Sequence, residues 1–300
     1  MLENRACPAE HGAVTAAADL RAGHERGTPG YRRLVGAVWA AGVGSFSRLY
    51  APQALLPLIS RDLDVSPSTA ALLVSVTTGT LALALVPMSY LAERVGRTRL
   101  MTVSLLVAAV LGLLLPLAPT IGPLIALRAV QGVAVAGLPA LAMAHLSAEV
   151  RRSSLGAAMG LYIAGTTVGG LASRVVPGVV ADVGGWRVGM GAVGVLGLVC
   201  VVAFRLLLPP PTARPDGAAG GRGYLAHHLR DPGVRRLCAS AFVLMAAFVT
   251  VYNFLGYRLL EEPFGLSPLL VGLVFVTYLA GTTSSPVAGR LGDRFGRRAV

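Results

Sequence analysis

Apolar stretches of about 20 residues recur from Leu34 almost to the end of the chain, and this recurrence constrains the fold more than any other feature. A helix needs about 20 apolar residues to cross the roughly 30 Å hydrocarbon core of a bilayer. Lipid offers no hydrogen-bond partner to a bare backbone amide, so each stretch must be helical. The eight stretches lie at 34–59, 70–90, 100–118, 121–145, 154–177, 186–208, 237–258 and 267–289. The sequence therefore predicts an all-α integral membrane protein.

Composition agrees with this fold class and argues against several others. Of the 300 residues, 54% are hydrophobic and 13% are charged, about half the charged fraction of a typical soluble domain. The net charge of +12 invites a nucleic-acid partner, but the basic residues form short clusters between apolar stretches rather than one polar face. The three cysteines lack metal-ligand spacing, and no phosphate-binding loop or catalytic triad pattern occurs. We expect no nucleic acid, no metal, no cofactor and no enzymatic activity.

The distribution of arginine predicts the orientation in the membrane. Every second loop is rich in arginine, whereas the loops between them hold little beyond Arg61, Arg187 and Arg258. Arginine-rich loops stay in the cytoplasm. We therefore expect a multi-pass protein of the cell membrane, with its N-terminus and its long linker in the cytoplasm.

The stretches divide the chain into regions. The polar N-terminal segment lacks a signal-peptide pattern and is interpreted as a disordered tail, in which His24 is solvated. His145, His227 and His228 are assigned to loops at the cytoplasmic edge. The expected regions are a cytoplasmic tail at 1–30, six spans at 31–208, a Pro-, Gly- and Arg-rich cytoplasmic linker at 209–236 and the remaining spans at 237–300.

A charged phrase occurs twice, offset by 200 residues, after the second and after the eighth stretch. Leucine, carboxylate, arginine, glycine and arginine appear in the same order in both copies. The first copy contains Ser89, Leu91, Glu93, Arg94, Gly96 and Arg97, and the second contains Gly289, Leu291, Asp293, Arg294, Gly296 and Arg297. The sequence therefore indicates an internal repeat with a period of six spans.

These two copies resemble the signature of the major facilitator superfamily of secondary transporters, G-x-L-a-D-r-x-G-r-k, from which the first copy departs at Ser89 and Glu93. The resemblance implies two six-helix halves that alternately open to each side of the membrane. In this chain it implies a complete six-helix N-terminal half and an incomplete C-terminal half, so the chain is either a fragment or a truncated gene product.

The residue types of the charged phrase suit a loop that holds neighbouring helices together in one conformational state and releases them in another. Gly96 and Gly296 permit backbone angles that a sharp loop needs. The carboxylates Glu93 and Asp293 can pair with arginines across the loop and interact with helix dipoles, holding neighbouring helices together in one state. The alternative is that the arginines only anchor the topology.

The fourth stretch carries a second resemblance to the family, L-x-x-x-R-x-x-Q-G, at Arg128, Gln131 and Gly132. A charge within the bilayer costs at least about 2.5 kcal/mol, so Arg128 should face a wet cavity or a partner. Gln131 shares its face, and Gly132 lets another helix approach. In the family this arginine is implicated in proton or substrate coupling. The alternative is an arginine that snorkels to the interface.

The fifth stretch carries a glycine array that includes Gly165, Gly169 and Gly170. Small residues at these spacings let helices pack closely. The array lacks the Gly-Pro step of the family's antiporter branch and resembles uncharacterised efflux-type permeases, for which we expect export.

Together these features predict a monomeric transporter that exports a small organic or drug-like solute by proton antiport. Further cavity candidates are Arg48, Tyr50, Gln53, Tyr252 and Asn253. No Asp or Glu lies inside the stretches, so either Arg128 modulates coupling with a carboxylate missing from this sequence or protons are not the coupling ion. Other hypotheses are an importer of the same fold, a non-transporting scaffold or sensor, and a lipid-modifying membrane enzyme, which would need clustered histidines or carboxylates.

Overall fold

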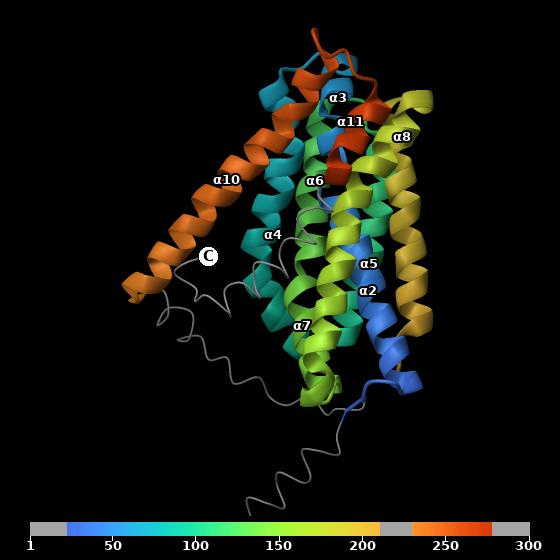
Figure 1. Ribbon diagram of the computed structural model, residues 1–300, viewed down its shortest axis with the longest axis vertical. Coiled ribbons are helices and arrows are strands. Elements are labelled where there is room, and N and C mark those ends of the chain that lie inside the picture. The colour runs from blue at the N-terminus through green and yellow to red at the C-terminus, as the bar shows by residue number, and fades with distance from the viewer. Residues whose placement is uncertain (1–22, 211–229, 278–300) are drawn as a thin grey trace, which may run out of the picture.

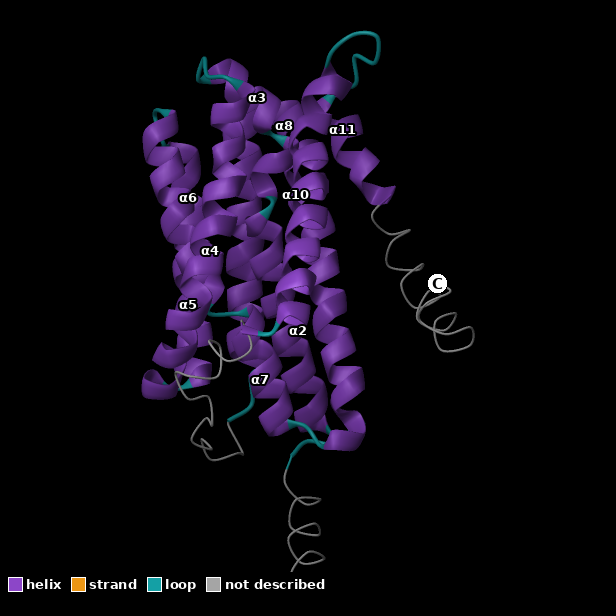
Figure 2. Ribbon diagram, turned by 90° about the vertical axis from the view of Figure 1, so that its left-hand side faces the viewer, coloured by secondary structure: helices purple, strands orange, loops and turns teal. Residues whose placement is uncertain are grey.

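The computed structural model describes residues 23–210 and 230–277. Within them the chain forms helices that run side by side along one axis (Figures 1 and 2), and the single bridge between His24 and Val150 is the one β-type contact. The predicted all-α fold is confirmed.

The helices follow the first seven predicted spans closely, and residues 278–289 of the eighth lie outside the described residues. The first span is broken into α2 (Pro29–Leu49), η1 (Ala51–Ala54) and α3 (Leu56–Asp62), and the next two are α4 (Pro67–Val95) and α5 (Arg97–Leu114) with η2 (Leu115–Leu117). The fourth is divided into α6 (Ile121–Ala136) and α7 (Pro139–Glu149), and α8 (Arg152–Leu207) contains the fifth and sixth. The later spans are α10 (Pro232–Leu260), α11 (Pro268–Val274) and η3 (Phe275–Thr277).

Four helices begin at the same local signal, a capping side chain followed by proline. Thr28, Ser66, Asp231 and Ser267 each accept a hydrogen bond from a backbone N–H of the first helical turn, and the next residue is proline in every case. The side chain satisfies a donor that the helix leaves without a partner, and proline lacks the N–H that would otherwise be orphaned.

Helix α8 has 56 residues, which would extend about 84 Å if it were straight, nearly three times the hydrocarbon thickness. Gly185 divides it into two arms, 152–184 and 186–207, with φ 76° and ψ 176°. This left-handed φ strains any residue with a side chain, which is why glycine stands at the reversal.

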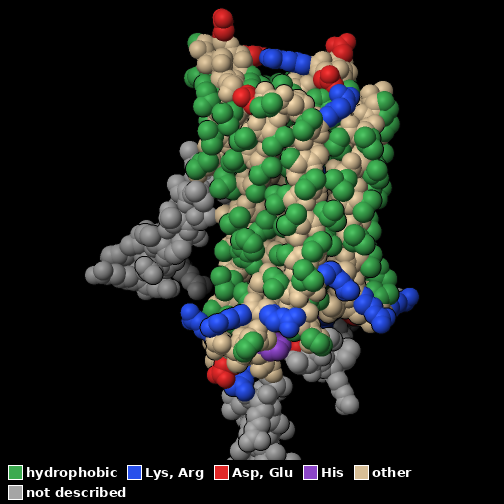
Figure 3. Space-filling model, turned by 90° about the vertical axis from the view of Figure 1, so that its right-hand side faces the viewer, with side chains coloured by type: hydrophobic (Ala, Val, Ile, Leu, Met, Phe, Trp, Pro, Cys, Tyr) green, Lys and Arg blue, Asp and Glu red, His purple; other side chains and the backbone are tan. Residues whose placement is uncertain are grey.

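The outside of the bundle is apolar. Leu83 is 80% exposed and Phe242 is 75% exposed, and five helical segments of the described residues are long and apolar enough to cross a membrane. Figure 3 shows apolar side chains over the middle of the molecule, with arginines gathered at its lower end. We refer to the end that holds Arg97 and Arg151 as the arginine-rich end, and to the end that holds Asp62 and Arg187 as the opposite end.

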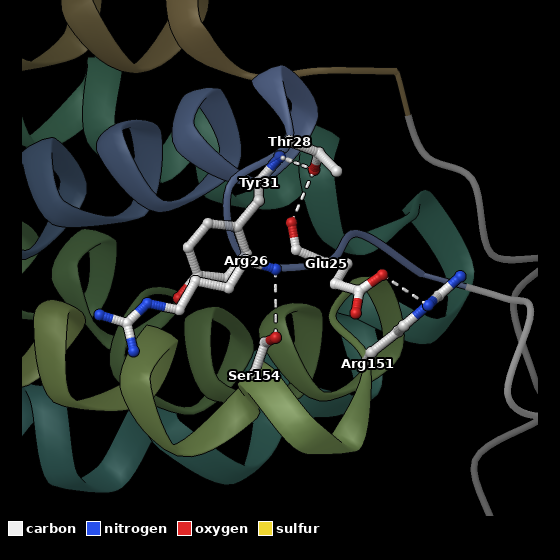
Figure 4. Close-up of polar contacts among 6 residues, drawn as sticks. All are labelled: Glu25, Arg26, Thr28, Tyr31, Arg151 and Ser154. Atoms are coloured by element: carbon white, nitrogen blue, oxygen red, sulfur yellow. Dashed lines mark hydrogen bonds and ion pairs between the residues drawn. The ribbon is translucent and has the colours of Figure 1, made fainter.

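Residues 23–28 depart from the predicted disordered tail, because they pack on the turn between α7 and α8 (Figure 4). The N–H of His24 donates to the carbonyl of Glu149 at 2.7 Å, and the N–H of Arg26 donates to Ser154 Oγ at 3.1 Å. Glu25 pairs with Arg151 at 2.7 Å. Most of these contacts use backbone atoms, which leave no pattern in the sequence. The expected tail at 1–22 lies outside the described residues.

Candidate functional site

Glycines of the first arm of α8 bring it directly against α2. A Cβ placed on Gly165 would lie 2.7 Å from the carbonyl oxygen of Trp39, and one on Gly169 would lie 2.5 Å from that of Val43. The two backbones therefore touch, as expected for these two glycines. Gly170 differs, because the nearest atom to its added Cβ is Arg174 Nη1 at 3.8 Å, an ordinary contact.

Gly132 plays the same part between α6 and α4. A Cβ added there would collide with the Thr77 carbonyl oxygen and with Thr80 Oγ1. Thr80 Oγ1 donates to the carbonyl of Ala129 at 2.9 Å, so the two helices are also joined by a hydrogen bond. The expected close approach of another helix at Gly132 is confirmed.

Arg128 is completely buried and ties three helices together. Its Nε donates to the Leu73 carbonyl of α4 at 2.9 Å, while Nη1 and Nη2 donate to the carbonyls of Arg48 and Leu49 at 2.9 and 2.7 Å. These last two carbonyls are available because α2 ends at Leu49, and the final carbonyls of a helix have no partner within it. Gln131 Oε1 accepts from Nη1 at 2.5 Å. Arg128 therefore contacts protein partners and does not snorkel.

Arg48, next to these contacts, is in a different situation. Its side chain is 1% exposed, and none of its three guanidinium nitrogens has a hydrogen-bond partner among the described residues. It lines a small cavity of about 10 Å³ between α2, α5, α6 and the second arm of α8. The other residues around this cavity are Ala51, Gly112, Leu115, Gln131, Met190, Val193 and Gly194.

Arg174 is the centre of a second polar cluster, which sequence reasoning missed. Its Nη2 donates to Gln53 Oε1 at 2.6 Å, and Gln53 Nε2 donates to Asn253 Oδ1 at 2.8 Å. The guanidinium also lies within 5.0 to 5.3 Å of the ring centroids of Tyr50, Tyr252 and Phe275. Four predicted cavity residues, Tyr50, Gln53, Tyr252 and Asn253, thus meet around Arg174. The signal was available, since Arg174 interrupts an apolar run just as Arg128 does.

Residues 38–300 match the family model of the Major Facilitator Superfamily. The chain belongs to this superfamily.

Several members are similar over most of the chain. The inner membrane transport protein YnfM of Escherichia coli (strain K12) is 35% identical over 92% of this chain and 67% of its own length. The uncharacterized MFS-type transporter YybF of Bacillus subtilis (strain 168) is 38% identical over 90% of this chain and 68% of its own. A solved bacterial homolog of the human lysosomal transporter Spinster, inward-facing and occupied, has a TM-score of 0.77 at 17% identity, over 90% of this chain and 63% of that one. This chain thus spans about two thirds of the length of the relatives.

The first copy of the superfamily's charged loop lies between α4 and α5. Gly96 ends α4 with φ 91°, which confirms the need for glycine in this turn. Ser89, Leu91, Glu93 and Arg94 are exposed, and Glu93 forms no ion pair within the described residues. The second copy, at 289–297, lies outside the described residues, so pairing between loops stays a prediction.

The assignment of His145 to a loop is wrong. His145 lies in α7 and is buried, one helical turn before Glu149, which is also buried. The polar residues around them suggested a loop, whereas α7 packs against α4, α5 and α8 and both side chains are buried. His227 and His228 lie outside the described residues. Among the described residues, no group of three His, Cys, Asp or Glu side chains is close enough to hold a metal ion.

Proposed function

We propose that this chain is a secondary active transporter that exports a small organic, drug-like solute in exchange for protons. The observation that carries the proposal is that α10 and α11 contact the six preceding spans at one end of the bundle. These contacts lie at the opposite end, where Gln53 bonds to Asn253 and the Tyr257 hydroxyl donates to the Leu56 carbonyl at 3.0 Å.

Toward the arginine-rich end, α10 leaves the bundle (Figure 1), and its first residues are exposed. Contact at one end and separation at the other are what alternating access requires of two halves that rock around a central site. Outward opening would then break the link between Gln53 and Asn253. By the positive-inside rule, the arginine-rich end is cytoplasmic in this proposal.

Export is supported by a relative. The chloramphenicol resistance protein of Streptomyces lividans is 33% identical over 57% of this chain and 44% of its own length. A transporter lowers the concentration of a toxic compound in the cell by moving it out. The same direction is proposed here.

Protons need a titratable carrier, and the described part of the chain offers one pair. His145 and Glu149 are buried and four residues apart, so they share one face of α7. Both lie at the arginine-rich end. We assign proton transfer to this pair rather than to Arg128, whose donors are engaged by carbonyls and Gln131.

The test uses everted membrane vesicles from cells that express the chain, energised to an acidic interior. Adding chloramphenicol should raise the internal pH in proportion to solute uptake. Glu149→Gln should abolish the pH change, whereas Glu261→Gln, which alters an exposed carboxylate at the opposite end, should not. Solute uptake without any pH change refutes antiport, and no gradient-driven uptake refutes export.

A further inference from the structure

Positive charge is concentrated in the interior of this bundle. Arg48, Arg128 and Arg174 are each at most 2% exposed. Burying a guanidinium without an acceptor is costly, because the group loses its hydration and gains nothing in return. Arg128 donates to four acceptors, and Arg174 donates to Gln53 and the Gly170 carbonyl. Arg48 stands apart, because its five N–H donors find no acceptor in the described part of the chain.

The backbone makes room for Arg48 in particular. A Cβ added to Gly197 would collide with its Nη1, and Cβ atoms added to Gly44 and Gly112 would lie 3.4 Å from its Nη2 and 3.6 Å from its Cδ. These glycines belong to three helices, namely the second arm of α8, α2 and α5. The guanidinium is therefore held in a defined position between helices, at the cavity.

The cavity offers no acceptor to Arg48. Gln131 is the other polar side chain that lines it, and its Oε1 accepts from Arg128 and makes no hydrogen bond to Arg48. Its Nε2 donates to the Ala108 carbonyl at 2.9 Å. The remaining lining is apolar or glycine. A group that enters must accept hydrogen bonds from a cation and lie against apolar side chains, and a cationic compound would be repelled.

We infer that Arg48 binds the carboxylate of a small organic acid with an apolar body, and this inference rests on the proposed transport of a small organic solute. The cavity of about 10 Å³ has room for one oxygen-sized group. The carboxylate therefore enters first, and the part of the body next to it lies against the apolar lining at the cavity entrance. Met190, an unbranched and adaptable side chain on the cavity wall, can move to admit the second oxygen.

The test is equilibrium binding of radiolabelled benzoate to the purified full chain in detergent micelles. Benzamide, which has the same shape without the charge, and chloride, which has the charge without the body, serve as competitors. We expect benzoate to bind and to be displaced by neither competitor at equal concentration. Displacement by benzamide would show that binding does not need the carboxylate charge, and displacement by chloride would show that it does not need the apolar body. Either result overturns the inference. Absence of benzoate binding overturns the inference.

Variants locate the site. Arg48→Gln should weaken benzoate binding at least about tenfold, the loss expected for a charge-assisted hydrogen bond. Gly197→Ala keeps the charge and displaces the guanidinium, so it should weaken binding as well. Arg205→Gln removes an exposed arginine from the same arm of α8 as Gly197 and should leave binding unchanged. Binding within twofold of wild type in a folded Arg48→Gln or Gly197→Ala variant overturns the inference.

Binding in micelles needs no gradient, so the two proposals can fail separately. Arg48-dependent benzoate binding without transport rejects only the proposed function. Proton-coupled uptake of chloramphenicol without benzoate binding rejects only the assignment of Arg48.

Discussion

Replacing Gly169 by alanine should destabilise the bundle, because α2 and α8 touch there through their backbones. The added Cβ would lie 2.5 Å from the Val43 carbonyl oxygen and 2.9 Å from its Cα, whereas ordinary contacts begin at 3.4 Å. A backbone atom cannot turn aside as a side chain can, so the helices must separate locally by roughly 1 Å. Overpacking of this kind costs about 1–3 kcal/mol. For a chain of 300 residues, we expect the melting temperature to fall by about 2–5 °C.

The neighbouring glycine provides a matched control on the same helix. An alanine at Gly170 meets nothing closer than Arg174 Nη1 at 3.8 Å, so Gly170→Ala should be neutral or slightly stabilising. The assay is the loss of the monomer peak in size-exclusion chromatography after heating detergent-solubilised protein through a temperature series. Equal melting temperatures for the two alanine variants would show that α2 and α8 do not approach as closely as described.

Three further predictions follow from individual contacts. Arg128→Met leaves the carbonyls that end α2 without a donor and should lower the stability measured in the same thermal assay by about 1–3 kcal/mol. An unchanged melting temperature would contradict its linking role. A double-mutant cycle of Gln53→Ala and Asn253→Ala should give a coupling energy of about 0.5–3 kcal/mol in thermal unfolding, and additive effects would show that the two side chains do not interact. Asp62 lies beyond the apolar part of the first span, and its pKa is lowered by hydrogen bonds from the Trp186 indole and then from a neighbouring arginine. Its stabilising effect is therefore present above the pKa of the unfolded chain and lost as the pH falls through the lower folded pKa, so melting curves of Asp62→Asn should depend less on pH in this acidic range than those of wild type.

Local signals predicted much of the fold. The positions of the spans came from apolar length, and the turn at Gly96 came from the need for a left-handed φ in a short loop. Arg128 was predicted to need a partner because its charge lies deep in an apolar segment, and the carbonyls at the end of α2 provide it. These predictions succeeded because each depends on one helix and on the solvent around it.

The predictions that failed, and the residues that were missed, depend on contacts between segments far apart in the chain. His145 looks like a loop residue until α7 packs against its neighbours, and residues 23–28 look like a tail until their backbone bonds to the turn after α7. The role of Arg174 could not be predicted, because the rings and amides around it come from η1 and α10.

By itself, the sequence determined that this chain is a set of apolar helices whose arginine-rich turns lie at one end, because hydrophobic length and charge act locally and additively. Only the tertiary structure decided which buried arginines are satisfied and which one faces a cavity. Arg48 and Arg128 are both arginines inside apolar segments. They differ only in whether a neighbouring helix ends, and so exposes its carbonyls, within reach of the guanidinium.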